Sequence, residues 1–80
     1  MSSPFTPIAV SARSGEPLGF RWRRSWHRVT AVEERWQDAG AWWADERPSW
    51  FYRVVVEGGG VFELVSDLEG EHWWLYRVYD

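Results

Sequence analysis

Aromatic content restricts the fold of this chain more than any other feature, because the chain has few other sources of support. Its 80 residues include eight tryptophans, four phenylalanines and three tyrosines, but no cysteine. A chain this short buries only about 60% of the surface that it exposes when unfolded, and disulfides cannot compensate here. Each aromatic side chain can bury about 150–250 Å². We therefore expect a single small domain with a core built around indoles.

Hydrophobic alternation predicts β-strands and not helices. Leu18, Phe20 and Trp22 alternate with Arg21 and Arg23, which is the period of two expected for a strand with one dry and one wet face. No segment has a convincing helical period over a useful length. We predict this strand and five further candidates: Ile8–Ala12, Trp26–Trp36, Trp50–Glu57, Val61–Ser66 and His72–Tyr79.

Turn residues separate these candidates at Arg13–Glu16, Arg23–Ser25 and Gly58–Gly60. Val29 and Val32 are three residues apart, so they share a face only if the strand contains a bulge or if the segment is a short helix. The predicted fold is all-β, with five or six antiparallel strands in a strongly curved sheet or small barrel. One long loop, Gln37–Ser49, interrupts it.

The expected organisation is an extended N-terminal arm over residues 1–7, which contains two prolines, and a single β domain over residues 8–80. The N-terminus has no signal-peptide pattern, and no window is long and apolar enough for a membrane helix. We therefore expect a soluble, cytoplasmic protein with no membrane partner.

The stretch GFRWRRSWHRV, residues 19–29, contains four of the nine arginines and two of the eight tryptophans. Three interpretations are open for Arg21, Arg23, Arg24 and Arg28. In the first, they contact phosphates of a nucleic acid while aromatic rings stack on bases. In the second, they pair with an acidic protein surface. In the third, they form the solvated face of a hairpin.

The charge distribution bears on that choice. Residues 1–28 carry five arginines and one glutamate, whereas residues 29–80 carry four arginines and eleven acidic residues. A net charge of −3 argues against a dedicated duplex binder. The chain has no lysine or asparagine, a bias typical of GC-rich coding that makes arginine the default cation.

Trp42 and Trp43 are the other candidate contact residues, because two consecutive indoles in a loop cannot easily enter one core. An exposed indole would be a natural hot spot for a protein partner. The alternative is that the loop folds back over an open end of the barrel and buries both rings.

Catalytic and metal chemistry are not expected. His27 and His72 are the only histidines, too few for a metal site without cysteine. The serines lie in no nucleophile motif, and Gly58–Gly60 lacks the lysine of a phosphate loop. We expect no enzyme activity, no catalytic residues, no metal, no cofactor and no small-molecule substrate.

Several motifs are similar to one small family. They are ERW at Glu34–Trp36, GAWW at Gly40–Trp43, YRV at Tyr52–Val54, EGGGVFEL at Glu57–Leu64 and WWLYRVYD at Trp73–Asp80. Together they resemble a tryptophan-rich domain of unknown function from actinobacteria and the Deinococcus–Thermus group, over roughly Leu18 to Asp80. A similar segment closes ImuB-like proteins, the inactive polymerase relatives that organise translesion synthesis. The resemblance implies a DNA-damage-tolerance setting and no site residues.

These observations favour a non-enzymatic interaction module that associates with itself or docks a protein partner through a Trp/Arg surface. The alternative is a module that binds single-stranded nucleic acid through Arg21, Arg23, Arg24 and Arg28 together with exposed aromatic rings.

Overall fold

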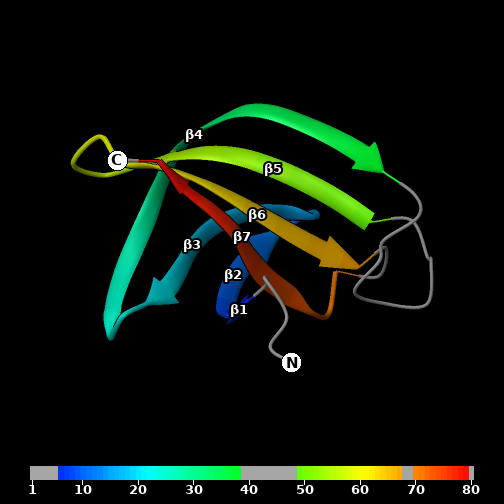
Figure 1. Ribbon diagram of the computed structural model, residues 1–80, viewed down its shortest axis with the longest axis horizontal. Helices are drawn as coiled ribbons and strands as arrows, with labels where there is room; N and C mark the ends of the chain where they lie inside the picture. The colour runs from blue at the N-terminus through cyan, green and yellow to red at the C-terminus, as the bar shows by residue number, and fades with distance from the viewer. Residues whose placement is uncertain (1–5, 39–48, 68–69, 80) are drawn as a thin grey trace.

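The computed structural model describes residues 6–38, 49–67 and 70–79, and every regular element within them is a β-strand (Figure 1). No helix in these ranges could cross a membrane. All neighbouring strands are antiparallel, in the order β1-β7-β6-β5-β4-β3-β2. The strands are β1 (Thr6–Pro7), β2 (Ala9–Arg13), β3 (Glu16–Trp22), β4 (Ser25–Asp38), β5 (Ser49–Val56), β6 (Val61–Asp67) and β7 (Trp73–Tyr79).

The all-β prediction is confirmed, but the sheet has seven strands and not five or six. The additional strand is β1, which comes from the end of the predicted arm and pairs with β7 through Thr6↔Leu75 and Pro7↔Trp74. Proline is tolerated there because β1 lies at the sheet edge, where one row of backbone donors has no partner. Gln37 and Asp38, predicted to lie in the long loop, belong to β4, and Ser49, predicted as its last residue, begins β5. The rest of the predicted loop lies outside the described residues.

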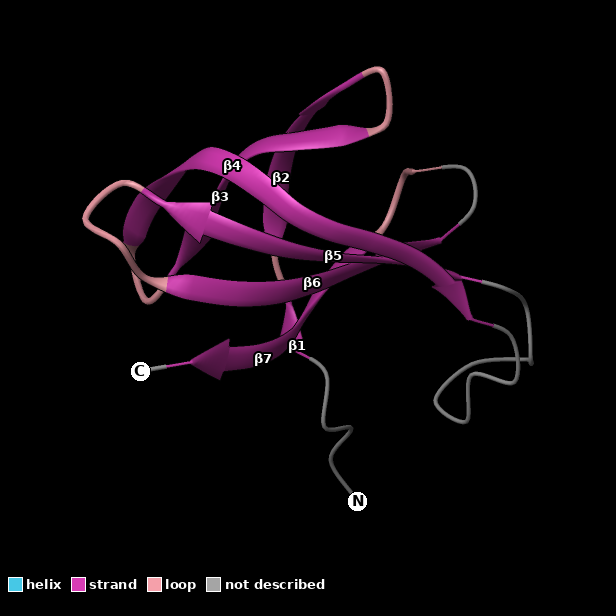
Figure 2. Ribbon diagram, turned by 90° about the horizontal axis from the view of Figure 1, so that it is seen from above, coloured by secondary structure: helices cyan, strands magenta, loops and turns pink. Residues whose placement is uncertain are grey.

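β4 bends and thereby curls the sheet (Figures 1 and 2). Its first residues pair with β3, and from Val29 onward it pairs with β5. The register of the β4–β5 pair shifts between Val29 and Ala31 and again between Val32 and Glu34. These shifts confirm the bulge predicted from the Val29/Val32 spacing, and the helical alternative is wrong. The extra residues of a bulge bend a strand and increase its twist, which accounts for the curl.

The curled sheet forms a half-barrel whose two edges are joined by the chain itself. Only Ile8 separates β1, on one edge, from β2, on the other. The Ile8 amide donates a hydrogen bond to the Trp73 carbonyl at 3.1 Å, which anchors this junction to β7.

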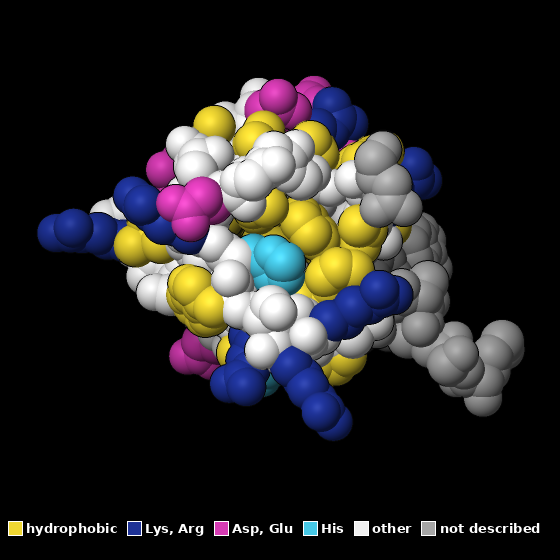
Figure 3. All heavy atoms as spheres, turned by 90° about the vertical axis from the view of Figure 1, so that its left-hand side faces the viewer, with side chains coloured by type: hydrophobic (Ala, Val, Ile, Leu, Met, Phe, Trp, Pro, Cys, Tyr) yellow, Lys and Arg dark blue, Asp and Glu magenta, His cyan; other side chains and the backbone are white. Residues whose placement is uncertain are grey.

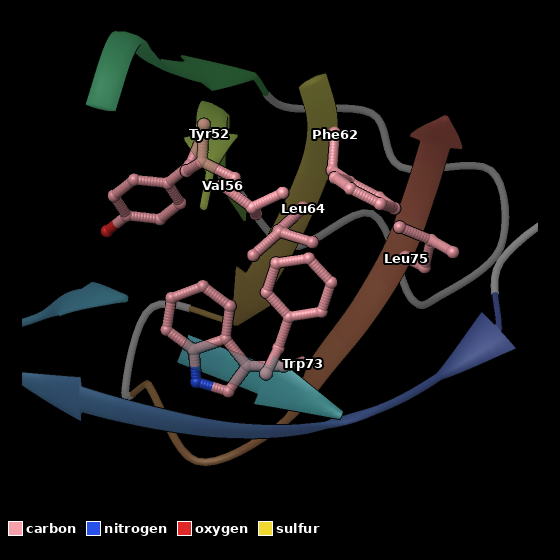
Figure 4. Close-up of a cluster of buried hydrophobic side chains, with 8 residues drawn as sticks. Tyr52, Val56, Phe62, Leu64, Trp73 and Leu75 are labelled. Atoms are coloured by element: carbon pink, nitrogen blue, oxygen red, sulfur yellow. The ribbon is translucent and has the colours of Figure 1, made fainter. Parts of the chain in front are cut away.

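The main core fills the concave side of the half-barrel (Figure 4). Side chains from β5, β6 and β7 point toward one another there, and Phe20 of β3 and Leu64 of β6 are completely buried. Trp73 is the only tryptophan of the described part that is fully in a core, so the expected indole-centred core is largely one of phenylalanine, valine and leucine. Its buried members are Phe20, Tyr52, Val54, Val56, Phe62, Leu64, Trp73 and Leu75.

A second, smaller cluster lies on the other side of the sheet around Phe51 and Val65. Trp36 stacks on Phe51 with ring centroids 5.3 Å apart, and Trp74 also packs against this cluster. Trp73 and its neighbour Trp74 therefore belong to opposite faces, as the alternation of side chains along a strand predicts.

Candidate functional site

The arginine-rich stretch forms the β3–β4 hairpin, which lies at the left of Figure 1 with the β5–β6 turn. Trp22 pairs with Ser25, so Arg23 and Arg24 alone make the turn. Both have left-handed backbones, with φ of 53° and 67°. Two consecutive positive φ angles suit the twist of a two-residue hairpin, but they normally require Asn-Gly. Arginine in this conformation costs about 1–2 kcal/mol per residue.

The register separates the hairpin side chains into two faces. Phe20 pairs with His27, and their rings stack inside with centroids 5.3 Å apart. Arg21 pairs with Trp26 and Gly19 pairs with Arg28, so these four residues share the opposite, outer face. The sequence-predicted Arg21 and Arg28 are therefore on one surface, and Arg23 and Arg24 are at its end.

Trp26 is the most exposed large hydrophobic side chain of the described ranges, at 56%. Its indole covers Gly19 diagonally across the strand pair. A β-carbon at Gly19 would come within 2.6 Å of Cζ2 and 2.9 Å of Nε1 of the ring. Glycine at position 19 is what lets the ring approach the strand so closely. One side of the indole is thus fixed against backbone, while more than half of the residue remains accessible.

The hairpin cations differ in their partners. Arg28 lies 3.6 Å from the Glu57 carboxylate, and the Glu57 amide donates to the Arg28 carbonyl at 2.8 Å. The Arg23 guanidinium lies 4.4 Å from the Trp22 ring centroid. In the described part of the chain, no carboxylate is within salt-bridge distance of Arg21, Arg23 or Arg24.

We name Arg21, Arg23, Arg24 and Trp26 the Arg–Trp hairpin face. Figure 3 shows the left-hand end of the molecule, where arginine side chains project around a hydrophobic area that has a histidine at its centre. Trp26 was not predicted as a contact residue. The sequence predicted a three-residue turn, Arg23–Ser25, whereas the turn in the structure has two residues. A two-residue turn places Trp26 opposite Arg21 on the solvent-facing side of the hairpin. Trp42 and Trp43, which were predicted, lie outside the described residues.

A cavity of about 230 Å³ lies away from the hairpin face, lined by Arg35, Trp50 and Tyr52 among others. The Tyr52 hydroxyl donates to the Gly15 carbonyl at 2.8 Å, and burial raises the pKa of this hydroxyl above its ordinary value. The Arg35 guanidinium lies 5.1 Å from the Trp50 ring centroid. Sequence patterns did not predict this cavity, because its lining comes from three different strands and two turns.

Asp67 and His72 form an ion-pair geometry beside this cavity. Nδ1 of His72 is 2.9 Å from Oδ2 of Asp67, and the backbone amides of Glu71 and His72 donate to Oδ1 at 2.9 and 3.3 Å. Burial alone would raise the pKa of the Asp67 carboxyl, but these hydrogen bonds outweigh it and hold that pKa below its ordinary value.

The lowered pKa of Asp67 predicts a loss of stability in acid. A carboxylate whose pKa is depressed by folding stabilises the fold above its unfolded pKa of about 3.9, and this contribution is lost as the pH falls through the lower, folded value. We expect Asp67→Asn to flatten the fall in thermal midpoint between neutral pH and strong acid. Thermal denaturation of both proteins across that range checks this, and identical acid limbs would contradict it. Asn can accept the same amide hydrogen bonds through its Oδ1, but its amide nitrogen replaces the oxygen that faces His72, so the variant removes the charge and changes the His72 contact.

The two histidines do not come together. His27 lies inside the hairpin and His72 beside Asp67. Within the ranges 6–38, 49–67 and 70–79, no three histidine, aspartate or glutamate side chains are grouped so that they could hold a metal ion.

The outer face of the sheet also carries a network around Glu63, which is only 3% exposed. Arg53 donates to Glu63 Oε2 through Nε at 3.0 Å, and its Nη2 is 2.9 Å from the same oxygen. The Tyr79 hydroxyl donates to this oxygen at 3.0 Å, and Arg53 also contacts the more exposed Glu34 at 3.0 Å.

Comparison with known families gives one match, described as "Domain of unknown function (DUF6504)", over residues 4–80. Comparison with curated proteins and with solved structures gives no match. The expectation of a small family of unknown function is therefore confirmed. Since the matched region is nearly the whole chain, the protein belongs to the DUF6504 domain family.

Proposed function

We propose that this protein is a non-enzymatic interaction module, and that the Arg–Trp hairpin face is the surface through which it contacts an anionic partner. The observation that carries the proposal is the combination of an exposed, backbone-supported indole with three arginines that have no carboxylate partner among the described residues. Tryptophan and arginine are the residue types most enriched at binding hot spots.

Three further observations support this proposal over a structural role alone. The left-handed Arg23–Arg24 turn carries a conformational cost that Asn-Gly would avoid. Positive charge is concentrated in the first 28 residues although the whole chain has a net charge of −3. The arginines also project from a hairpin anchored in the core by Phe20, which provides a rigid base for a contact surface.

Catalysis has less support. Asp67–His72 is the only histidine–carboxylate pair in the described segments, and no hydroxyl there hydrogen-bonds to either histidine ring. The partner in this proposal is an acidic protein segment, a second copy of the chain, or a single-stranded nucleic acid. We also propose that the protein acts in DNA-damage tolerance, which the resemblance to ImuB-like proteins supports. The proposed location is the cytoplasm, as expected from the sequence.

Charge reversal on the hairpin tests this function. We expect Arg21→Glu/Arg24→Glu to abolish retention on dextran sulfate, a polyanion that has neither bases nor amino acids, at about 50 mM salt. The matched control, Arg13→Glu/Arg35→Glu, makes the same change in net charge on exposed arginines away from the hairpin turn, and it should keep most of the retention. Equal losses in the two variants would assign binding to net charge and would contradict the proposal. Light scattering of the unmodified protein tests the second copy as partner.

A further inference from the structure

We propose that the anionic partner of the Arg–Trp hairpin face is single-stranded nucleic acid, with one base stacked on Trp26 and neighbouring phosphates held by Arg21 and Arg24. This proposal rests on the proposed function and names its ligand class. It is carried by the geometry of the indole and by the charges beside it.

Trp26 has the geometry of a stacking platform. The ring is fixed over Gly19, whose position would not admit even a β-carbon beneath it, and the residue is 56% exposed. No other ring or guanidinium of the described chain stacks on it. A flat π surface held on a strand can accept any base, and such stacking is worth about 1–3 kcal/mol per base.

The cations lie where a nucleotide strand passing over that ring would place its phosphates. Arg21 is directly across the strand pair from Trp26, and Arg23 and Arg24 follow at the end of the same hairpin. Arginine guanidinium groups donate paired hydrogen bonds to phosphate oxygens. Arg28 is on the same face but is occupied by Glu57 at 3.6 Å. The Arg23 guanidinium lies over the ring of Trp22, which packs against the main core, so we count two cations, Arg21 and Arg24, for phosphate.

Nucleic acid fits this arrangement better than an acidic peptide does. Aspartate and glutamate side chains supply anions but no flat ring for the indole, whereas a nucleotide strand supplies both at every step. A duplex hides its base faces within the stack, but a single strand exposes them. A dedicated duplex binder normally has a clearly basic domain. This protein has a net charge of −3 and a small positive area, which suits a short single strand better than a duplex.

The test uses fluorescence anisotropy of a labelled oligothymidylate of about twelve nucleotides, a length within the range of known single-strand sites. The probes for comparison are an abasic oligonucleotide of the same length, the matching duplex and a polyglutamate peptide. We expect the oligothymidylate to bind most tightly. The logarithm of its association constant should fall with the logarithm of salt concentration with a slope of about −1.4, since each of the two phosphate contacts of a single strand contributes about −0.7.

The variants separate stacking from charge. Trp26→Ala is expected to weaken oligothymidylate binding roughly 5- to 150-fold, the equivalent of about 1–3 kcal/mol, and to leave abasic binding unchanged. Trp26→Phe should bind oligothymidylate more tightly than Trp26→Ala does. Gly19→Ala should weaken oligothymidylate binding by a smaller factor than Trp26→Ala, because its β-carbon displaces the indole. Arg21→Ala should weaken binding to both oligonucleotides and reduce the salt slope, while Arg13→Ala should not. Circular dichroism confirms that each variant is folded.

The outcomes distinguish this proposal from the function on which it rests. Equal binding of the abasic and thymidine oligonucleotides, or no effect of Trp26→Ala, would overturn base stacking but would leave a polyanion-binding face. Tighter binding of polyglutamate would overturn the nucleic-acid ligand and would identify an acidic protein partner. Failure of every probe to bind at low salt would overturn both.

Discussion

Replacing Phe20 with alanine is expected to lower the free energy of unfolding by about 3–5 kcal/mol, the usual cost of removing a buried phenylalanine. Phe20 has no exposed surface, and its ring contacts Phe62 of β6 edge-to-face at 5.1 Å and His27 of β4 by stacking at 5.3 Å. It therefore joins the arginine-rich hairpin to the main core. Since small domains are stable by only about 5–15 kcal/mol, this loss is a large fraction of the total.

Urea and thermal denaturation measure this effect, and Leu18→Ala is the matched control. Leu18 lies two residues earlier on β3 and is 48% exposed, so it should lose less than about 1 kcal/mol. Similar losses for the two variants would contradict the assignment of Phe20 as the anchor. Because the hairpin depends on this anchor, Phe20→Ala should also weaken polyanion binding although it removes no charge.

Replacing Glu63 with alanine is expected to produce the second largest effect, about 1.5–3 kcal/mol, which is typical of hydrogen bonds to a charged group. Glu63 is 3% exposed and accepts hydrogen bonds from Arg53 and Tyr79. Its removal leaves the Tyr79 hydroxyl without this acceptor. The Arg53 side chain is 37% exposed and regains water, which keeps the loss below that of a fully buried pair.

Glu34→Ala is the control for this prediction, because Glu34 contacts the same guanidinium from the exposed side. Its carboxylate is 3.0 Å from Arg53, but its side chain is 56% exposed. Exposed ion pairs contribute about 0–1 kcal/mol, so we expect little change in the urea midpoint. If Glu34→Ala were as damaging as Glu63→Ala, burial would not be what makes the Glu63 network stabilising.

Local patterns account for the strands that could be predicted. The alternation of Leu18, Phe20 and Trp22 located β3, and the glycines at 58–60 located the turn after β5. The prediction that Leu18 lies on the dry face is wrong, since Leu18 is 48% exposed and Pro17 is buried in its place. The spacing of Val29 and Val32 also indicated the bulge in β4. β1 could not be predicted in this way, because two residues containing a proline have no period. Its existence depends on pairing with Leu75 and Trp74 at the other end of the chain.

The sequence predicted the charged residues of the candidate site but not its aromatic residue. The four hairpin arginines were identified from their density, but Trp26 was assigned to the strand and not to the surface, because the turn was predicted one residue too long. Glu63 shows the same limit for burial. Glu63 lies between Phe62 and Leu64, so the alternation of side chains along β6 places it on the outer face. Arg53 and Tyr79, from two other strands, contact it there and bury it.

Ile8 also sets the order in which the sheet can be completed during synthesis on the ribosome. Strands β2 to β6 pair with their neighbours in sequence, so each hairpin can form soon after it leaves the exit tunnel. β1 has no such neighbour, because its partner is β7. The nascent chain therefore carries an unpaired first strand beside a growing sheet until Leu75 has emerged. β1 can complete the seam only after β7 is in place, so a chain that has not yet formed β7 holds a sheet with two open edges, on β2 and β6, that are prone to aggregation.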